Sequence, residues 1–138
     1  MESVSARLSQ AGYELPEVAA PAAAYVPAVE DRGVIRTSGQ LPLENGELSC
    51  IGAVGEDGAD PDDAYEAARI VDRLARVVKV TGFVSSRPSF TGQAGVLNGA
   101  SDFFQDIFGT PHARSAVGVA ALPLNASVEV EVEFALNN

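Results

Sequence analysis

The sequence predicts an α+β fold in which one mixed β-sheet packs against two helices on one face. Near the C-terminal end, apolar residues and glutamates alternate strictly over residues 128–134, which is typical of a strand with one buried face. Apolar residues recur at helical spacing over residues 61–75 and 93–108, which predicts the two helices. Together with an Asn-Gly turn at residues 45–46, these patterns give the element order β-β-α-β-α-β-β, with a hairpin at each end.

The N-terminal half begins with a short helix over residues 4–11, where three apolar side chains share one face and Gly12 can end the helix. Residues 16–27 are rich in alanine and proline, and we expect them to be extended. A first strand over about residues 33–40 and a second over about residues 47–54 flank the Asn-Gly turn, which favours a hairpin.

The C-terminal half alternates helix and strand. The helix at residues 61–75 begins with Pro-Asp-Asp, which suits a helix N-terminus. A strand over about residues 77–85 precedes the second helix, which Gly109 ends. Residues 113–134 are interpreted as two neighbouring strands joined by a Pro-Leu-Asn turn.

Composition restricts the possible functions. A chain of 138 residues has the size of one domain, and 46% hydrophobic with 20% charged residues is typical of a globular protein. Nine basic against 19 acidic residues give a net charge of −10, which opposes non-specific binding to nucleic acid. Cys50 is the only cysteine and His112 the only histidine, so we expect no disulfide and no metal site. Without an apolar run of membrane-spanning length or a signal-peptide pattern, we expect a cytoplasmic protein with no membrane partner.

Four blocks in the same order resemble the reactive intermediate deaminase family, known as RidA or YjgF. They are Tyr25-Val26 with residues 34–42, the strand at residues 78–84, Asn98-Gly99-Ala100-Ser101, and Ala113-Arg114-Ser115 with the later Leu-Pro and the glutamate-bearing strand. The resemblance runs from about Ala20 to about Phe134, and the His-Ala-Arg-Ser form of the last block resembles a branch described as chorismate-mutase-like.

The resemblance implies the chorismate-mutase-like α+β fold for a single domain over residues 1–138, with residues 1–20 as an N-terminal extension. It also implies a homotrimer with active sites in the clefts between subunits. Compared with the family, the first long helix is expected to be shortened near residues 70–71, because no glycine, proline or turn pair separates it from the next strand.

Arg114 and Glu129 are the candidate catalytic residues. A guanidinium group can hold a carboxylate by two parallel hydrogen bonds, and a carboxylate can orient a water for attack. The resemblance implies that Arg114 holds the substrate carboxylate and that Glu129 positions the water. Because the two residues are expected on neighbouring strands, we expect their side chains to meet across the sheet. The structural alternative is that they only neutralise each other.

Five further residues are candidates for substrate binding: Tyr25, Ser38, Gly39 and Asn98 by the same resemblance, and His112 because an imidazole can hydrogen-bond a ligand and titrate near neutral pH. Tyr25 would line the cleft, and Asn98 would open the second helix. Simple packing, capping and turn roles are the structural alternatives for all of them. His112 stands where the family usually has proline.

The function expected from the resemblance is an enamine/imine deaminase that hydrolyses reactive 2-imino acids, such as the tautomer of 2-aminoacrylate, to 2-keto acids and ammonia. Hydrolysis of this small carboxylate substrate would need no cofactor. A different class of function stays open, namely a non-catalytic trimeric module that binds small carboxylates in the same clefts. Chorismate mutase activity is a third interpretation, which rests on fold analogy alone.

Overall fold

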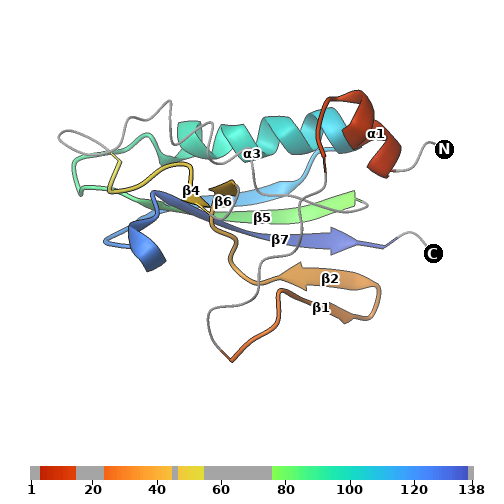
Figure 1. The fold of residues 1–138 in the computed structure, drawn as a ribbon, viewed down its shortest axis with the longest axis horizontal. Helices are drawn as coiled ribbons and strands as arrows, with labels where there is room; N and C mark the ends of the chain where they lie inside the picture. Colours follow the sequence, from red (N-terminus) through yellow and green to blue (C-terminus); the bar gives the residue numbers. More distant parts are fainter. Residues whose placement is uncertain (1–3, 15–23, 45–46, 55–75, 137–138) are drawn as a thin grey trace.

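A five-stranded mixed sheet forms the centre of the molecule (Figure 1). The computed structural model describes residues 4–14, 24–44, 47–54 and 76–136. In the order in which they lie side by side, the strands are β1 (Ala28–Asp31), β2 (Val34–Thr37), β7 (Val128–Ala135), β5 (Arg76–Ser85) and β6 (Ala113–Val119). β5 and β6 are parallel and all other neighbours are antiparallel, so the predicted mixed α+β fold is confirmed.

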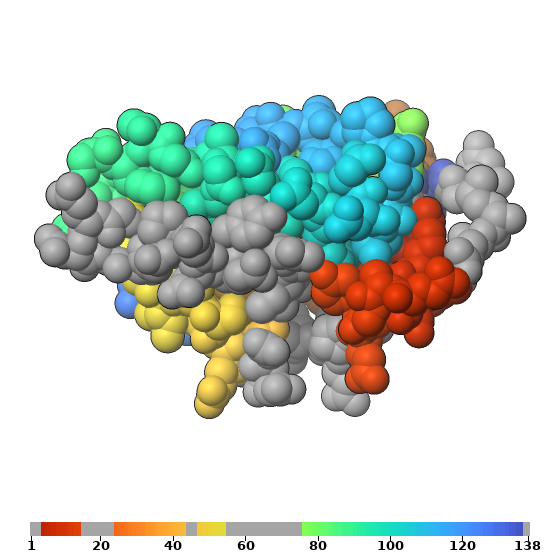
Figure 2. All heavy atoms as spheres, turned by 90° about the horizontal axis from the view of Figure 1, so that it is seen from above, coloured from red at the N-terminus to blue at the C-terminus, as the bar shows by residue number. Residues whose placement is uncertain are grey.

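Helix α3 (Gln93–Phe108) covers one face of this sheet (Figure 1). It connects β5 to β6, as expected for a parallel pair, which needs a crossover rather than a tight turn. The helix has the predicted bounds, and Gly109 ends it in the left-handed conformation with φ of 65°. Helix α1 (Val4–Gln10) lies beside the C-terminal half of α3 (Figure 2), where Leu8 is buried.

The core lies between α3 and the sheet. Alternate residues of β7 point to it, so that Val128, Val130, Val132 and Phe134 are buried as predicted. On β5, Gly82 lies directly under Leu97 of α3, and a Cβ atom there would approach its Cδ2 atom to 2.8 Å. These contacts identify the core side of the sheet at every strand, because cross-strand partners point to the same face.

Three sequence predictions for the strands are wrong. β6 and β7 are not neighbours, since β5 lies between them, so residues 113–134 form no hairpin. No strand was predicted at β1, which directly follows the segment interpreted as extended. All four residues of β1 are exposed, so the sequence carries no alternation between buried and exposed positions there. The strand predicted over residues 47–54 is much shorter in the structure, where only β4 (Glu47–Leu48) forms. β4 pairs with β3 (Leu43–Glu44) in a separate two-stranded sheet, and isolated β-bridges follow at Ile51 and Val54.

The predicted helix at residues 61–75, its shortening near residues 70–71 and the N-terminal extension beyond residue 14 fall outside the described residues. Within the described part, a 3-10 turn (Pro123–Asn125) precedes β7, at the predicted Pro-Leu-Asn position. None of the helices described here has the length and apolar character needed to cross a membrane.

Candidate functional site

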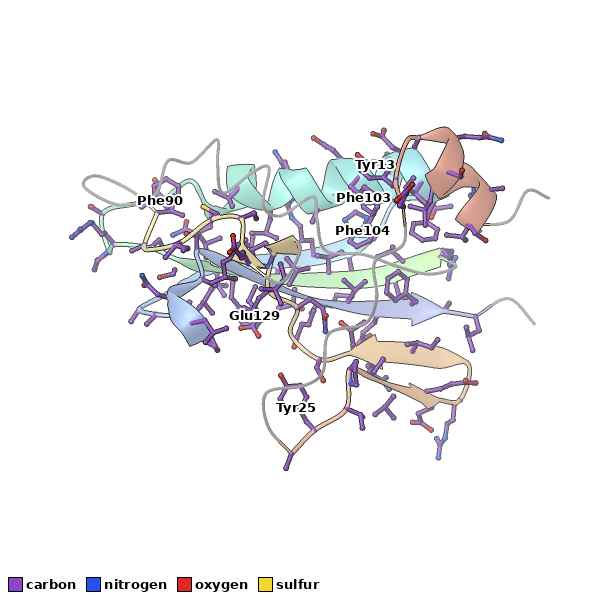
Figure 3. All side chains as sticks on the ribbon, in the orientation of Figure 1. Tyr13, Tyr25, Phe90, Phe103, Phe104 and Glu129 are labelled. Carbon is purple, nitrogen blue, oxygen red and sulfur yellow. The ribbon has the colours of Figure 1, made fainter. Side chains whose placement is uncertain are left out.

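The predicted site residues fall into two groups on opposite faces of the sheet. Arg114 is paired with Val80 of β5, and both point to the side covered by α3. Glu129 is paired with Phe83, one residue away from the core-facing Val84 and Gly82, and therefore points to the other side. Figure 3 shows Glu129 on the side of β7 that faces away from α3.

The first group surrounds the Arg114 guanidinium at the edge between β6 and α3. Its Nη1 atom donates one hydrogen bond to Oδ1 of Asn98 at 2.8 Å and another to Oγ of Ser101 at 3.1 Å. Asn98 lies inside α3 and not at the start of the helix, where the resemblance places it. Ser101 follows Asn98 by three positions and therefore lies on the same face of the helix.

His112 belongs to this group through Ser101. Its Nε2 atom lies 3.0 Å from Oγ of Ser101, and its ring meets that of Phe104 edge-on at 6.2 Å. Burial and the neighbouring Arg114 charge lower the pKa of His112, so the ring favours its neutral form. His112 is therefore part of the arginine's surroundings and not an unconnected loop residue.

Ser101 is the residue that sequence reasoning missed. It was present in the Asn98 block of the family resemblance, but no role was given to it. The signal that could have revealed it is the spacing of three between two polar residues that border the buried apolar stripe of the helix.

The second group surrounds Glu129. Its carboxyl group lies against Gly39, where a Cβ atom would come within 2.6 Å of the glutamate Cδ atom. Burial, and then the charge of Glu131, raise the pKa of Glu129. Glu133 on the same face is paired with Arg36 at 3.3 Å, a partner that the sequence did not suggest.

Ser38 and Tyr25 lie on the Glu129 side of the molecule. Ser38 is tied to the segment before β1, because its Oγ donates to the carbonyl of Val26 at 2.5 Å and its N–H to that of Pro27 at 2.8 Å. Tyr25 is half exposed and lies below β7 on the side away from α3 (Figure 3). The structure thus places Gly39 against Glu129 and links the adjacent Ser38 to the segment that carries Tyr25.

The expected meeting of Arg114 and Glu129 within one chain is wrong. The two residues lie on opposite faces, with β5 between their strands. Arg114 is hydrogen-bonded to α3, whereas Glu129 lies against Gly39. The two groups are therefore separate within one chain.

A separate cavity of about 630 Å³ lies at the C-terminal ends of β5 and β6. Ser86, Phe90, Gln93 and Gly118 are among the residues that line it, and none of the predicted site residues does. Across the described ranges, no three His, Cys, Asp or Glu side chains gather in a way that could hold a metal ion.

Comparison with known proteins identifies the family. The model of the endoribonuclease L-PSP family matches residues 15–135, which include both groups. The chain belongs to this family, also called RidA/YjgF. The resemblance seen in the sequence motifs is therefore confirmed.

Relatives cover nearly the whole chain. Protein TCP17 from Trypanosoma cruzi is 42% identical over 155 aligned positions, which cover 98% of this chain and 95% of the relative. Since this chain has only 138 residues, TCP17 contains residues that it lacks. A crystal structure from Shewanella oneidensis has a TM-score of 0.89 at 29% identity, covering 98% of this chain and all of that one. The crystal structure of the E. coli YjgF gene product is also 29% identical and has a TM-score of 0.57. The match covers 86% of this chain and 94% of the YjgF chain.

Proposed function

We propose that this protein hydrolyses the C=N bond of 2-imino acids, releasing a 2-keto acid and ammonia, at sites that two copies of the chain complete together. The observation that carries the proposal is the anchored guanidinium of Arg114. Its contacts with Asn98 and Ser101 fix the group at the edge of the sheet, where a small carboxylate can reach it.

Glu129 is suited to handle water and protons. Hydrolysis of an imine requires a water at the carbon and proton transfers to the nitrogen. A carboxyl group whose pKa is raised by burial and by the Glu131 charge accepts a proton more readily than an ordinary glutamate. The adjacent Gly39 leaves room for the carboxyl group against the backbone.

A second copy of the chain is needed because Arg114 and Glu129 of one copy point to opposite faces. The outer edge of β6 pairs with no other strand of the described chain, and the face bearing Glu129 is not the one that α3 covers. We propose a homotrimer in which the Arg114 group of one copy meets the Glu129 group of the next. Size-exclusion chromatography with light scattering tests the trimer.

The activity is tested with 2-iminobutanoate produced in place by an amino acid oxidase and trapped by semicarbazide. Hydrolysis by the protein competes with trapping and slows the formation of the semicarbazone. Arg114→Ala should abolish this effect, because it removes the carboxylate anchor. Turnover by that variant at the wild-type rate would refute the proposal.

Arg32→Ala is the matched control. Arg32 lies in the turn between β1 and β2 with its side chain 93% exposed, and it is part of neither group. The control variant loses the same charge and should keep wild-type turnover. If the wild type binds 2-keto acids but hydrolyses no imine, the chain is the carboxylate-binding module instead.

A further inference from the structure

We propose that Ser101 and His112 form a positioning pair, which turns the Arg114 guanidinium so that its Nε–Nη2 edge is the one presented to a carboxylate. The proposal rests on the proposed role of Arg114 as the carboxylate anchor. It assigns a role to two residues for which the family motif provides none, and one of them stands where the family usually has proline.

The Nη1 atom of Arg114 is fully hydrogen-bonded, whereas the Nε–Nη2 edge of its guanidinium has no partner in the described chain. A guanidinium carries five N–H donors, of which two belong to Nη1. Both are used, one by Asn98 and one by Ser101. Within the described chain no hydrogen-bond partner is found for Nε or Nη2, so the side edge of the fork is available for a bidentate carboxylate.

The Ser101 hydroxyl lies between Arg114 and His112 and contacts both. Because Arg114 can only donate, Oγ of Ser101 must accept from it. The other neighbour of this oxygen is Nε2 of His112 at 3.0 Å, and the proposed arrangement directs the Ser101 hydroxyl hydrogen to it. In the proposed arrangement Nε2 is the acceptor, and the neutral ring carries its proton on Nδ1, a buried atom for which the described chain offers no hydrogen-bond partner.

The contact between Ser101 and His112 limits the rotation of the Arg114 guanidinium. Without an acceptor at Nε2, the Ser101 hydroxyl is free to turn, and its lone pairs are no longer held toward Arg114. Asn98 alone fixes one Nη1 hydrogen and leaves the guanidinium able to rotate about that contact. When both Nη1 hydrogens are held, the plane of the guanidinium group is fixed. Two parallel hydrogen bonds to a planar carboxylate depend on the orientation of that plane.

Binding of 2-ketobutyrate measured by calorimetry tests the pair without relying on turnover. Ser101→Ala should weaken binding about tenfold, the effect of losing one hydrogen bond to a charged group. His112→Leu should weaken binding by a similar factor, because the freed Ser101 hydroxyl no longer holds Arg114. His112→Gln should stay within about twofold of wild type, because its Oε1 can replace Nε2 as the acceptor. The double variant should bind no more weakly than Ser101→Ala alone, since both changes remove the same constraint.

The tautomer provides an independent readout. Long-range proton–nitrogen NMR of the only histidine should identify the Nδ1–H form in the wild type. Detection of the Nε2–H form, binding by His112→Leu as tight as wild type, additive losses in the double variant or absence of 2-ketobutyrate binding to wild type would each overturn the proposal. A wild type that binds the keto acid as described but hydrolyses no imine refutes only the proposed function.

Discussion

Substitution of Gly39 by alanine tests the role of Glu129 without touching it. The added Cβ atom would lie 2.6 Å from Cδ of Glu129 and closer still to Oε1. Non-bonded carbon atoms prefer about 3.5–4.0 Å, so the carboxyl group must move by about 1 Å. The backbone itself accepts alanine, because Gly39 is not among the residues with positive φ.

The expected effect is on catalysis rather than on folding. A displacement of about 1 Å in a reacting group can cost about 100-fold in rate, and we expect kcat/KM for imine hydrolysis to fall by about that factor. The carboxyl group is the far end of a flexible side chain and can give way at little cost in stability. Thermal unfolding followed by circular dichroism should therefore stay close to wild type.

Gly95→Ala is the control for adding a methyl group. Gly95 is exposed in α3, and a Cβ atom there meets nothing within 4 Å. This variant should keep full activity and gain up to about 1 kcal/mol in the free energy of unfolding, because alanine favours a helix. Wild-type kcat/KM in Gly39→Ala would refute the placement of Glu129 in the site.

Four further results are expected. Arg114→Lys should lose most affinity for 2-keto acids in calorimetry, because a point charge cannot replace a bidentate fork. Gly82→Ala should lower the free energy of unfolding in urea by about 1–3 kcal/mol, since the new methyl group collides with the buried Leu97. The pKa of His112 in the folded chain is lowered from 6.5, so the unfolded chain binds more protons than the folded chain just below that pH. As the pH falls through this range, the free energy of unfolding should therefore decrease more in wild type than in His112→Gln. Because the pKa of Glu129 is raised, its ionised form is disfavoured in the folded state, and Glu129→Gln should raise the melting temperature at neutral pH while abolishing turnover.

The elements that depend on local pattern were predictable. The bounds of α3 follow from its apolar stripe and from Gly109, and the alternation in β7 identified its buried face. β1 was not predictable, because a strand whose residues are all exposed leaves no alternation.

The order of the strands was not predictable from pattern alone. Two apolar strands joined by a turn are typical of a hairpin, yet β6 pairs in parallel with β5 because α3 carries the chain back along the sheet. This difference in strand order separates Arg114 on β6 from Glu129 on β7. The motif suggested Arg114 and Glu129 as partners in function, but only the strand register shows that they lie on opposite faces.

Complementation between inactive chains tests the shared site most directly. Arg114→Ala and Glu129→Gln are each expected to be inactive alone. Refolded together in equal amounts, they should recover activity at about a quarter of the sites, because random assembly places an intact arginine beside an intact glutamate at that frequency. Mixtures that assemble but recover no activity would contradict a site built from two copies of the chain.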